Sequence, residues 1–132
     1  MCAVDRLDVN NPQACAEYAK DISDMMHRTE CEHMTNPDYM TTQEDINEKM
    51  RSVLVDWLIE VHLKFKLLPE TLHLTINLID RYLSRVKVTR KRLQLVGVTS
   101  MLIASKYEEI YPPEIKDFVF VTDQAYNRED VL

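Results

Sequence analysis

Glycine, proline and cysteine are all scarce in this sequence. One glycine and five prolines among 132 residues are too few for the many chain reversals of a β-rich fold, so the composition favours helices. The cysteines, Cys2, Cys15 and Cys31, are odd in number and lack paired spacing, which predicts reduced thiols and no disulfide framework. The sequence therefore predicts an all-α fold.

Long apolar runs are also missing. No stretch approaches the roughly 20 apolar residues of a membrane span, and the first ten residues lack both the apolar core and the basic flank of a signal peptide. We therefore expect an intracellular protein with no membrane partner, in the nucleus and cytoplasm.

The charges are distributed unevenly along the chain, whose net charge is −6. Acids outnumber bases in residues 1–49 and 110–132, whereas bases outnumber acids in residues 50–109. This pattern predicts either complementarity within the chain or a surface that meets an acidic partner. The dense basic stripe of a nucleic-acid-binding protein is missing, so nucleic acid is not an expected partner.

Residues 93–109 are expected to form a central helix, because apolar residues fall on nearly every side of it and such a helix is usually buried. The only glycine of the sequence, Gly97, lies inside this helix and costs about 1 kcal/mol relative to alanine. Gly97, Ser100 and Ala104 share one face, which predicts that a crossing helix approaches closely there.

Periodicity and capping residues predict the other helices. They are expected over residues 12–28, 46–66 and 69–86, then from a cap at Thr89 through the central helix, with a short helix after Pro113 and a further helix start at Asn127. Residues 29–45 show no convincing periodicity and are expected to form a linker.

A cluster of His27, Cys31 and His33 has the ligand types that zinc prefers. A closed zinc site normally needs four protein ligands, and four at a recurring spacing are absent. A polar helix end at the surface is therefore the favoured interpretation, and we expect no metal and no cofactor. The sequence also has no Gly-rich phosphate loop and no nucleophile elbow, so an enzyme is not expected.

The charges at both ends of the central helix have the sign that the helix dipole disfavours. Arg90, Lys91 and Arg92 occupy the first turn, where they form either a solvated face or a docking surface for acidic groups. Glu108 and Glu109 lie at the C-terminal end, which suggests that they serve a partner and not the fold.

Three stretches together resemble one known family. They read MRSVLVDWLIEV (residues 50–61), LQLVGVTSMLIASKYEEIYPPEI (residues 93–115) and FVFVTD (residues 118–123). They are similar to the first cyclin box of mitotic cyclins, and Tyr107 together with FVFVTD favours the B type. The resemblance implies a five-helix cyclin box around the buried central helix over residues 46–132, with its last helix truncated, and an N-terminal accessory helix and linker over residues 1–45.

The same resemblance implies a function. It predicts a regulatory subunit, not an enzyme, that binds and activates a cyclin-dependent protein kinase in mitosis and recruits substrates or inhibitors bearing an Arg-x-Leu motif. An alternative is a cyclin-box adaptor or scaffold that activates no kinase; the intact KYEE sequence at residues 106–109 favours kinase contact.

Site residues also follow from the resemblance. The residues that match kinase-binding positions are Lys106, Tyr107, Glu108, Glu109, Tyr18, Asp21 and Ile22. The residues that match a substrate-docking patch are Met50, Val53, Leu54, Trp57, Glu60, Leu93 and Gln94. Periodicity alone would assign the apolar members on residues 50–57 to the core, so we expect some to be buried and some to line a shallow groove. Arg51 and Asp80 match a buried ion pair.

Overall fold

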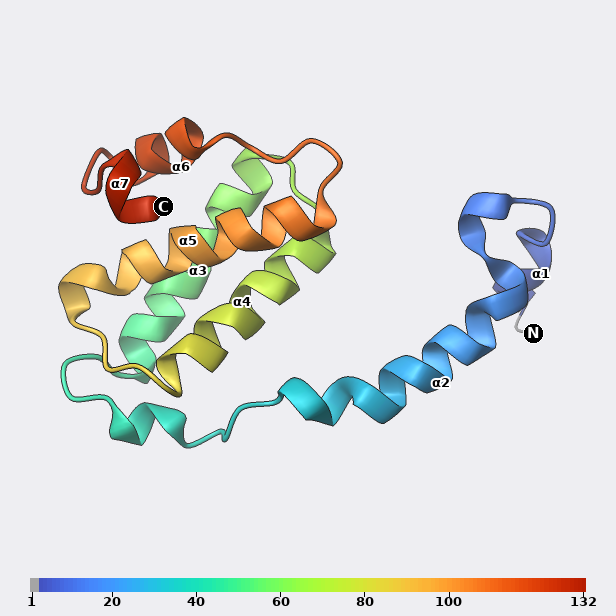
Figure 1. The fold of residues 1–132 in the computed structure, drawn as a ribbon, viewed down its shortest axis with the longest axis horizontal. Helices are drawn as coiled ribbons and strands as arrows, with labels where there is room; N and C mark the ends of the chain where they lie inside the picture. The colour runs from blue at the N-terminus through green and yellow to red at the C-terminus, as the bar shows by residue number, and fades with distance from the viewer. Residues whose placement is uncertain (1–2) are drawn as a thin grey trace. The chain divides into compact units, whose positions relative to one another are not determined.

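The computed structural model describes residues 3–132, apart from the side chain of Val4. Every regular element in that range is a helix, so the all-α prediction is confirmed (Figure 1). Cys2 lies outside the described residues. None of the described helices combines the length and the apolar character that crossing a membrane requires.

The chain divides into two compact units, the second of which begins at Thr35. This division falls before the boundary predicted after residue 45, because residues 39–46 pack on the second unit: Tyr39, Met40 and Ile46 are all buried in its core. Each unit is described by itself below.

The first unit contains α1 (Ala3–Leu7), α2 (Ala19–Thr29) and three short 3₁₀ turns (Pro12–Ala14, Ala16–Tyr18 and Glu30–His33). The expected helix start at Pro12 is wrong for the α-helix. Asn11 does cap a turn there, accepting from the Gln13 amide at 3.2 Å, but Cys15 adopts a left-handed conformation with φ 49°. That conformation interrupts the helical path, so the regular helix begins only at Ala19.

The second unit is built on three long helices. They are α3 (Glu48–Lys64), α4 (Pro69–Leu83) and α5 (Arg90–Glu108), followed by the short α6 (Ile115–Val121) and α7 (Arg128–Val131). The periodicity placed both bounds of α3 to within two residues. For α5, the cap predicted at Thr89 gives the observed start at Arg90, and the predicted end at residue 109 is one residue late. As predicted, Asn127 caps α7: its Oδ1 accepts from the Asp130 amide at 2.9 Å.

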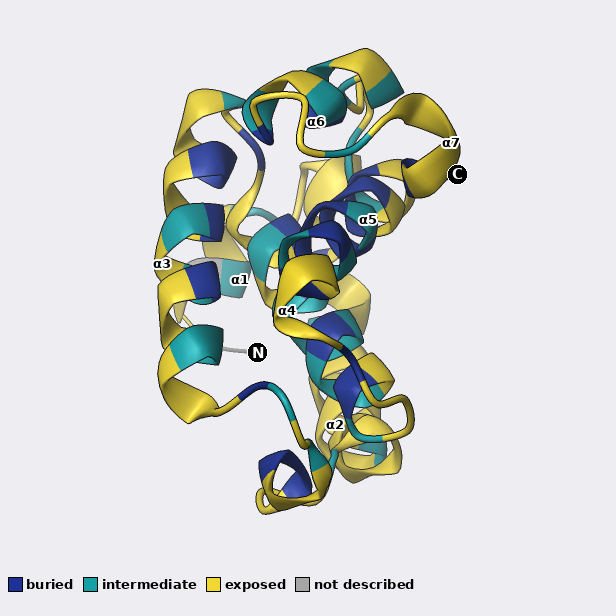
Figure 2. Ribbon diagram, turned by 90° about the vertical axis from the view of Figure 1, so that its left-hand side faces the viewer, coloured by how far each residue is buried: buried dark blue, intermediate teal, exposed yellow. Residues whose placement is uncertain are grey.

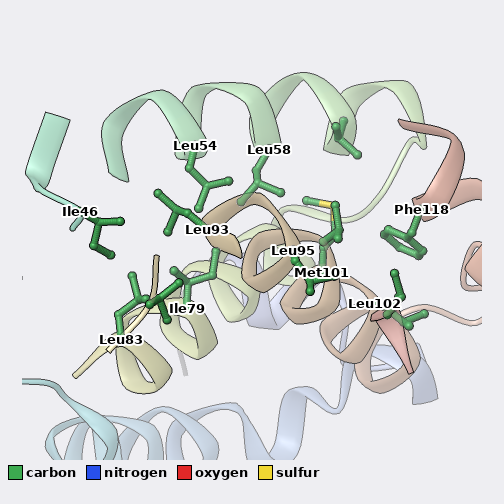
Figure 3. Close-up of a cluster of buried hydrophobic side chains, with 14 of the residues drawn as sticks. Ile46, Leu54, Leu58, Ile79, Leu83, Leu93, Leu95, Met101, Leu102 and Phe118 are labelled. Atoms are coloured by element: carbon green, nitrogen blue, oxygen red, sulfur yellow. The ribbon is translucent and has the colours of Figure 1, made fainter. Parts of the chain in front are cut away.

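Helix α5 supplies more buried residues than any other described helix, in line with its predicted central position. Figure 2 shows its buried faces beside those of α3 and α4. Figure 3 shows Leu54 and Leu58 of α3 directed toward α5, with Phe118 of α6 at the other end of this core.

The expectation that α5 is buried on every side is wrong along one face. Ile103 is 52% exposed, and it lines a cavity of about 650 Å³ together with residues of α4 and α7, among them Leu78, Tyr82 and Asp130. This face of α5 is therefore apolar without being enclosed by the described residues.

Gly97 has the close-packing role that its position predicted. A Cβ atom built at Gly97 would lie 2.8 Å from Cδ1 of Leu54, closer than carbon atoms normally approach. The missing side chain thus allows α5 to pack tightly against α3.

Candidate partner-binding surfaces

The predicted docking residues lie on α3 and on the first turns of α5. Leu54 and Leu93 are buried, each 6% exposed. Met50 and Trp57 are half-buried and pack against the same core, and Gln94 is also half-buried. Val53 is 63% exposed, and Glu60 is exposed as well.

This arrangement is the split between buried and exposed residues that was expected. Leu54 and Leu93 belong to the core, whereas Met50 and Trp57 are half-buried and Val53 is exposed to solvent. Glu60 adds an exposed carboxylate one turn further along α3 than Trp57. These positions therefore combine partly exposed apolar area with an exposed acid on the same helix. We call these seven residues the docking patch.

Arg51 and Asp80 form an ion pair next to this patch. Arg51 is bidentate: its Nε donates to Asp80 Oδ1 at 2.7 Å and its Nη2 donates to Oδ2 at 2.8 Å. The pair is only partly buried, because the two side chains keep 31% and 19% of their area exposed. The charge-assisted bond to Asp80 raises the pKa of the Arg51 guanidinium further, so it stays charged at any ordinary pH.

A third residue, Tyr39, joins this ion pair. Its phenol donates to Asp80 Oδ1 at 2.6 Å. Burial, and then the bond to the Asp80 carboxylate, raise the pKa of Tyr39 to about 12, because both disfavour a second negative charge at this point. Sequence reasoning did not find Tyr39, since nothing in a local pattern connects it with a residue on α4.

The four residues at the end of α5 that were predicted to contact a kinase differ in solvent exposure. Lys106 and Tyr107 are exposed, Tyr107 at 80%, whereas Glu108 and Glu109 are half-buried. An exposed cation and aromatic ring at the end of a helix can contact a partner directly.

Glu109 has a role within the fold. Its Oε1 accepts from the Leu68 amide and from Thr71 Oγ1, both at 2.6 Å. Both donors lie at the start of α4, and the Leu68 amide is a backbone group that the helix itself leaves without a partner. Glu109 therefore serves the fold, contrary to the expectation that it does not, whereas its contact with a kinase stays a prediction.

The other predicted kinase-binding residues belong to the first unit. Tyr18 precedes α2 and is 56% exposed, while Ile22 is 37% exposed and Asp21 is also exposed. Met25 and Met26 continue the exposed apolar surface along α2. No described residue of α2 is buried, so this helix presents a free amphipathic surface within its own unit.

The N-terminus of α5 is capped by a residue that lies far from it in the sequence. Thr89 precedes the helix as predicted, but it makes no side-chain capping bond. Instead Asp45 Oδ2 accepts from the Arg90 amide at 2.8 Å, and its Oδ1 accepts from Arg90 Nε at 3.0 Å. These bonds lower the pKa of the Asp45 carboxyl. Part of the cationic first turn is thus balanced by an acid of the same chain.

The cluster of His27, Cys31 and His33 forms no metal site. Within residues 3–132, no group of three or more His, Cys, Asp or Glu side chains is arranged to hold a metal ion. His27 Nδ1 instead lies 2.8 Å from the backbone oxygen of Ser23, one helical turn earlier.

Comparisons with known proteins identify relatives of this chain. Residues 21–132 match the family described as "Cyclin, N-terminal domain". The G2/mitotic-specific cyclin-B of Marthasterias glacialis is 56% identical and that of Hydra vulgaris 58% identical, each over 128 residues and 97% of this chain. Cyclin-B1-4 of Arabidopsis thaliana is 55% identical over 129 residues, or 98% of this chain. The chain spans only 33%, 35% and 33% of the length of these three relatives.

A solved structure shares the fold. The X-ray structure of a viral cyclin from herpesvirus saimiri matches 80% of this chain and 48% of its own, with a TM-score of 0.68 and 20% sequence identity. The predicted cyclin-box architecture is therefore confirmed.

Proposed function

This chain belongs to the family of cyclin N-terminal domains, and from that premise we propose that it is the kinase-binding part of a mitotic, B-type cyclin. In this proposal it is a regulatory subunit that binds and activates a cyclin-dependent serine/threonine kinase at the transition from G2 to mitosis. The observation that carries the proposal is the identity of 55–58% to proteins named cyclin-B over nearly the whole chain. We propose that the protein is located in the nucleus and cytoplasm, the compartments in which it would bind such a kinase.

The regulatory role is conformational. A protein kinase transfers phosphate only when its Lys–Glu ion pair and its activation segment are both in place. A partner that binds the active arrangement more tightly shifts the kinase toward it. The exposed Lys106 and Tyr107 at the end of α5, and the exposed side of α2 around Ile22, supply suitable contact surfaces.

The first experiment tests kinase activation. The chain, lengthened to the size of its relatives, is mixed with a monomeric mitotic cyclin-dependent kinase, and both pull-down and phosphate transfer are measured. We expect the double variant Lys106→Ala/Glu108→Ala to lose at least tenfold in activation. The matched control Lys49→Ala/Asp56→Ala, which removes one cation and one acid from exposed positions of α3, is expected to activate like the parent.

An adaptor that activates no kinase is the alternative. It predicts a parent chain that folds as a helical domain yet neither binds nor activates the kinase. That result would refute the regulatory proposal.

We also propose that the docking patch recruits substrates bearing an Arg-x-Leu motif. The leucine would lie on the apolar surface over Leu54 and Leu93, and the arginine would pair with Glu60 through a charge-assisted bond. Trp57→Ala is expected to weaken binding of an Arg-x-Leu peptide at least tenfold, while activity toward a substrate without the motif stays within twofold. Ile59→Ala, at an exposed apolar position of the same helix (38% exposed), is the control.

A further inference from the structure

Residues 39–46 lie near the start of the second unit and pack against its core. Tyr39, Met40 and Ile46 are buried in the core, at 8%, 8% and 5% exposure. Five polar residues lie between Met40 and Ile46, and the last three of them are Gln43, Glu44 and Asp45. We call residues 39–46 the clamp. Gln43, Glu44 and Asp45 all bind the same distant part of the chain, the connection between α4 and α5.

Gln43 satisfies backbone groups of that connection. Its Nε2 donates to the carbonyl oxygens of Leu83 and Val86, at 2.7 Å each. Its Oε1 accepts from the Val88 amide at 3.0 Å. Leu83 ends α4, and Val86 and Val88 lie in the loop that follows it, where backbone groups outside a regular helix need other partners. One amide side chain therefore fixes three points of the loop.

The next two residues continue the same attachment. Glu44 pairs with Lys87, and Asp45 binds both the amide and the guanidinium of Arg90. Together with Gln43, these bonds cover the loop from the last residue of α4 to the first residue of α5. The position of the first turn of α5 is thus set from outside that helix.

The clamp also leads directly into α3. Asn47 follows Ile46 and caps α3, accepting from the Met50 amide at 3.0 Å. The clamp therefore joins the start of α3, which carries Met50 and Val53, to the start of α5, which carries Leu93 and Gln94. Figure 3 shows Ile46, Leu83, Leu54 and Leu93 at this same end of the core.

We propose that Gln43 and Asp45 are positioning residues of the docking patch. They hold the first turn of α5, which is followed directly by Leu93 and Gln94, in place beside the start of α3. They do so without contacting the peptide. The proposal deepens the docking function proposed above and rests on it. Positioning matters because a preformed site avoids the cost of ordering its own walls when the ligand binds.

The experiment uses the whole 132-residue chain with Gln43→Leu, which keeps the approximate side-chain length but removes all three hydrogen bonds. Its control is Gln13→Leu, the same change at an exposed position of the first unit. The affinity for a labelled Arg-x-Leu peptide is measured by fluorescence anisotropy. A second signal needs no ligand: Trp57, the only tryptophan, lies in the patch, so its emission maximum and its quenching by acrylamide report the patch geometry.

We expect Gln43→Leu to bind the peptide at least fivefold more weakly and to change the Trp57 signal, with kinase pull-down within twofold of the parent. Asp45→Ala should act in the same direction. Asp45→Asn should restore most of the affinity, because an amide oxygen still accepts from the Arg90 amide. Recovery of affinity in Asp45→Asn would show that the hydrogen bond to the Arg90 amide, and not the negative charge of Asp45, supports peptide binding.

Two results would overturn the proposal. One is a parental peptide affinity and Trp57 signal in both Gln43→Leu and Asp45→Ala. The other is an equal loss of peptide binding, kinase binding and cooperative unfolding in both variants, which would mean general destabilisation. If the parent binds no Arg-x-Leu peptide, the proposed docking function is refuted. The positioning role is then tested by the Trp57 fluorescence of the free chains: a change in Gln43→Leu and Asp45→Ala relative to the parent supports it, and no change refutes it.

Discussion

At the scale of single residues, the ion pair of Arg51 and Asp80 is the interaction whose loss should cost most. We expect Arg51→Ala to lower the free energy of unfolding by about 2–4 kcal/mol. Removing the cation leaves the Asp80 carboxylate unpaired in a partly buried place, and breaking a fully buried pair costs about 3–5 kcal/mol; the residual exposure of 31% and 19% reduces that figure. Urea unfolding followed by circular dichroism measures it, with Lys49→Ala on an exposed position of the same helix as the control. An Arg51→Ala chain as stable as the parent would show that the pair does not support the fold.

Tyr39 adds a dependence on pH to the same network. Tyr39→Phe should cost about 1–2 kcal/mol at neutral pH, because the Asp80 carboxylate loses one charge-assisted hydrogen bond. Folding raises the pKa of Tyr39 from about 10 to about 12, so its stabilising contribution is complete below pH 10 and is lost as the pH rises toward 12. The difference in stability between parent and Tyr39→Phe should therefore be full at pH 8 and smaller at pH 11.5. A difference that stays constant over this range would contradict the assigned hydrogen bond.

At the scale of elements, the contact between α3 and α5 depends on one missing side chain. Gly97→Ala adds a Cβ atom 2.8 Å from Leu54 Cδ1, so Leu54 must move. This cost opposes the gain in helix propensity of about 1 kcal/mol, and we expect the substitution to be neutral or destabilising in the parent. In a Leu54→Ala background the clash is gone, and Gly97→Ala should stabilise by about 0.5–1 kcal/mol. A double-mutant cycle by urea unfolding measures this coupling, and additive effects would refute the close contact.

Most helix bounds could be predicted from local sequence patterns. The start of α2 and the caps of α4 and α5 could not. The apolar spacing of α3 and the capping residue of α7 are local features, and the structure confirms both. The start of α2 was misplaced because the left-handed conformation of Cys15 has no sequence signal of the kind that glycine gives. The caps of α4 by Glu109 and of α5 by Asp45 join residues about forty positions apart, a distance at which periodicity carries no information.

At the scale of the whole molecule, the two units are expected to unfold independently. Apart from Ala16, the buried apolar residues in the described part of the chain lie between Tyr39 and Val131. A chain of residues 35–132 should therefore melt within about 2 °C of the full chain, because its hydrophobic core is intact. If α2 contacts the kinase as proposed, the same truncation should weaken kinase pull-down several-fold. A clearly lower melting temperature would show that the first unit stabilises the second.

The sequence by itself determined the helical class, the central place of residues 93–109, the resemblance to the cyclin box and the pairing of Arg51 with Asp80. These follow from short-range periodicity, from residue types and from extended matching stretches. Only the tertiary structure decided that Tyr39, Met40 and Ile46 belong to the core, that Leu54 is buried while Val53 is exposed, and that Glu109 caps α4. The physical reason is that burial and hydrogen bonding between distant segments depend on which surfaces meet after packing, and neither leaves a local pattern in the chain.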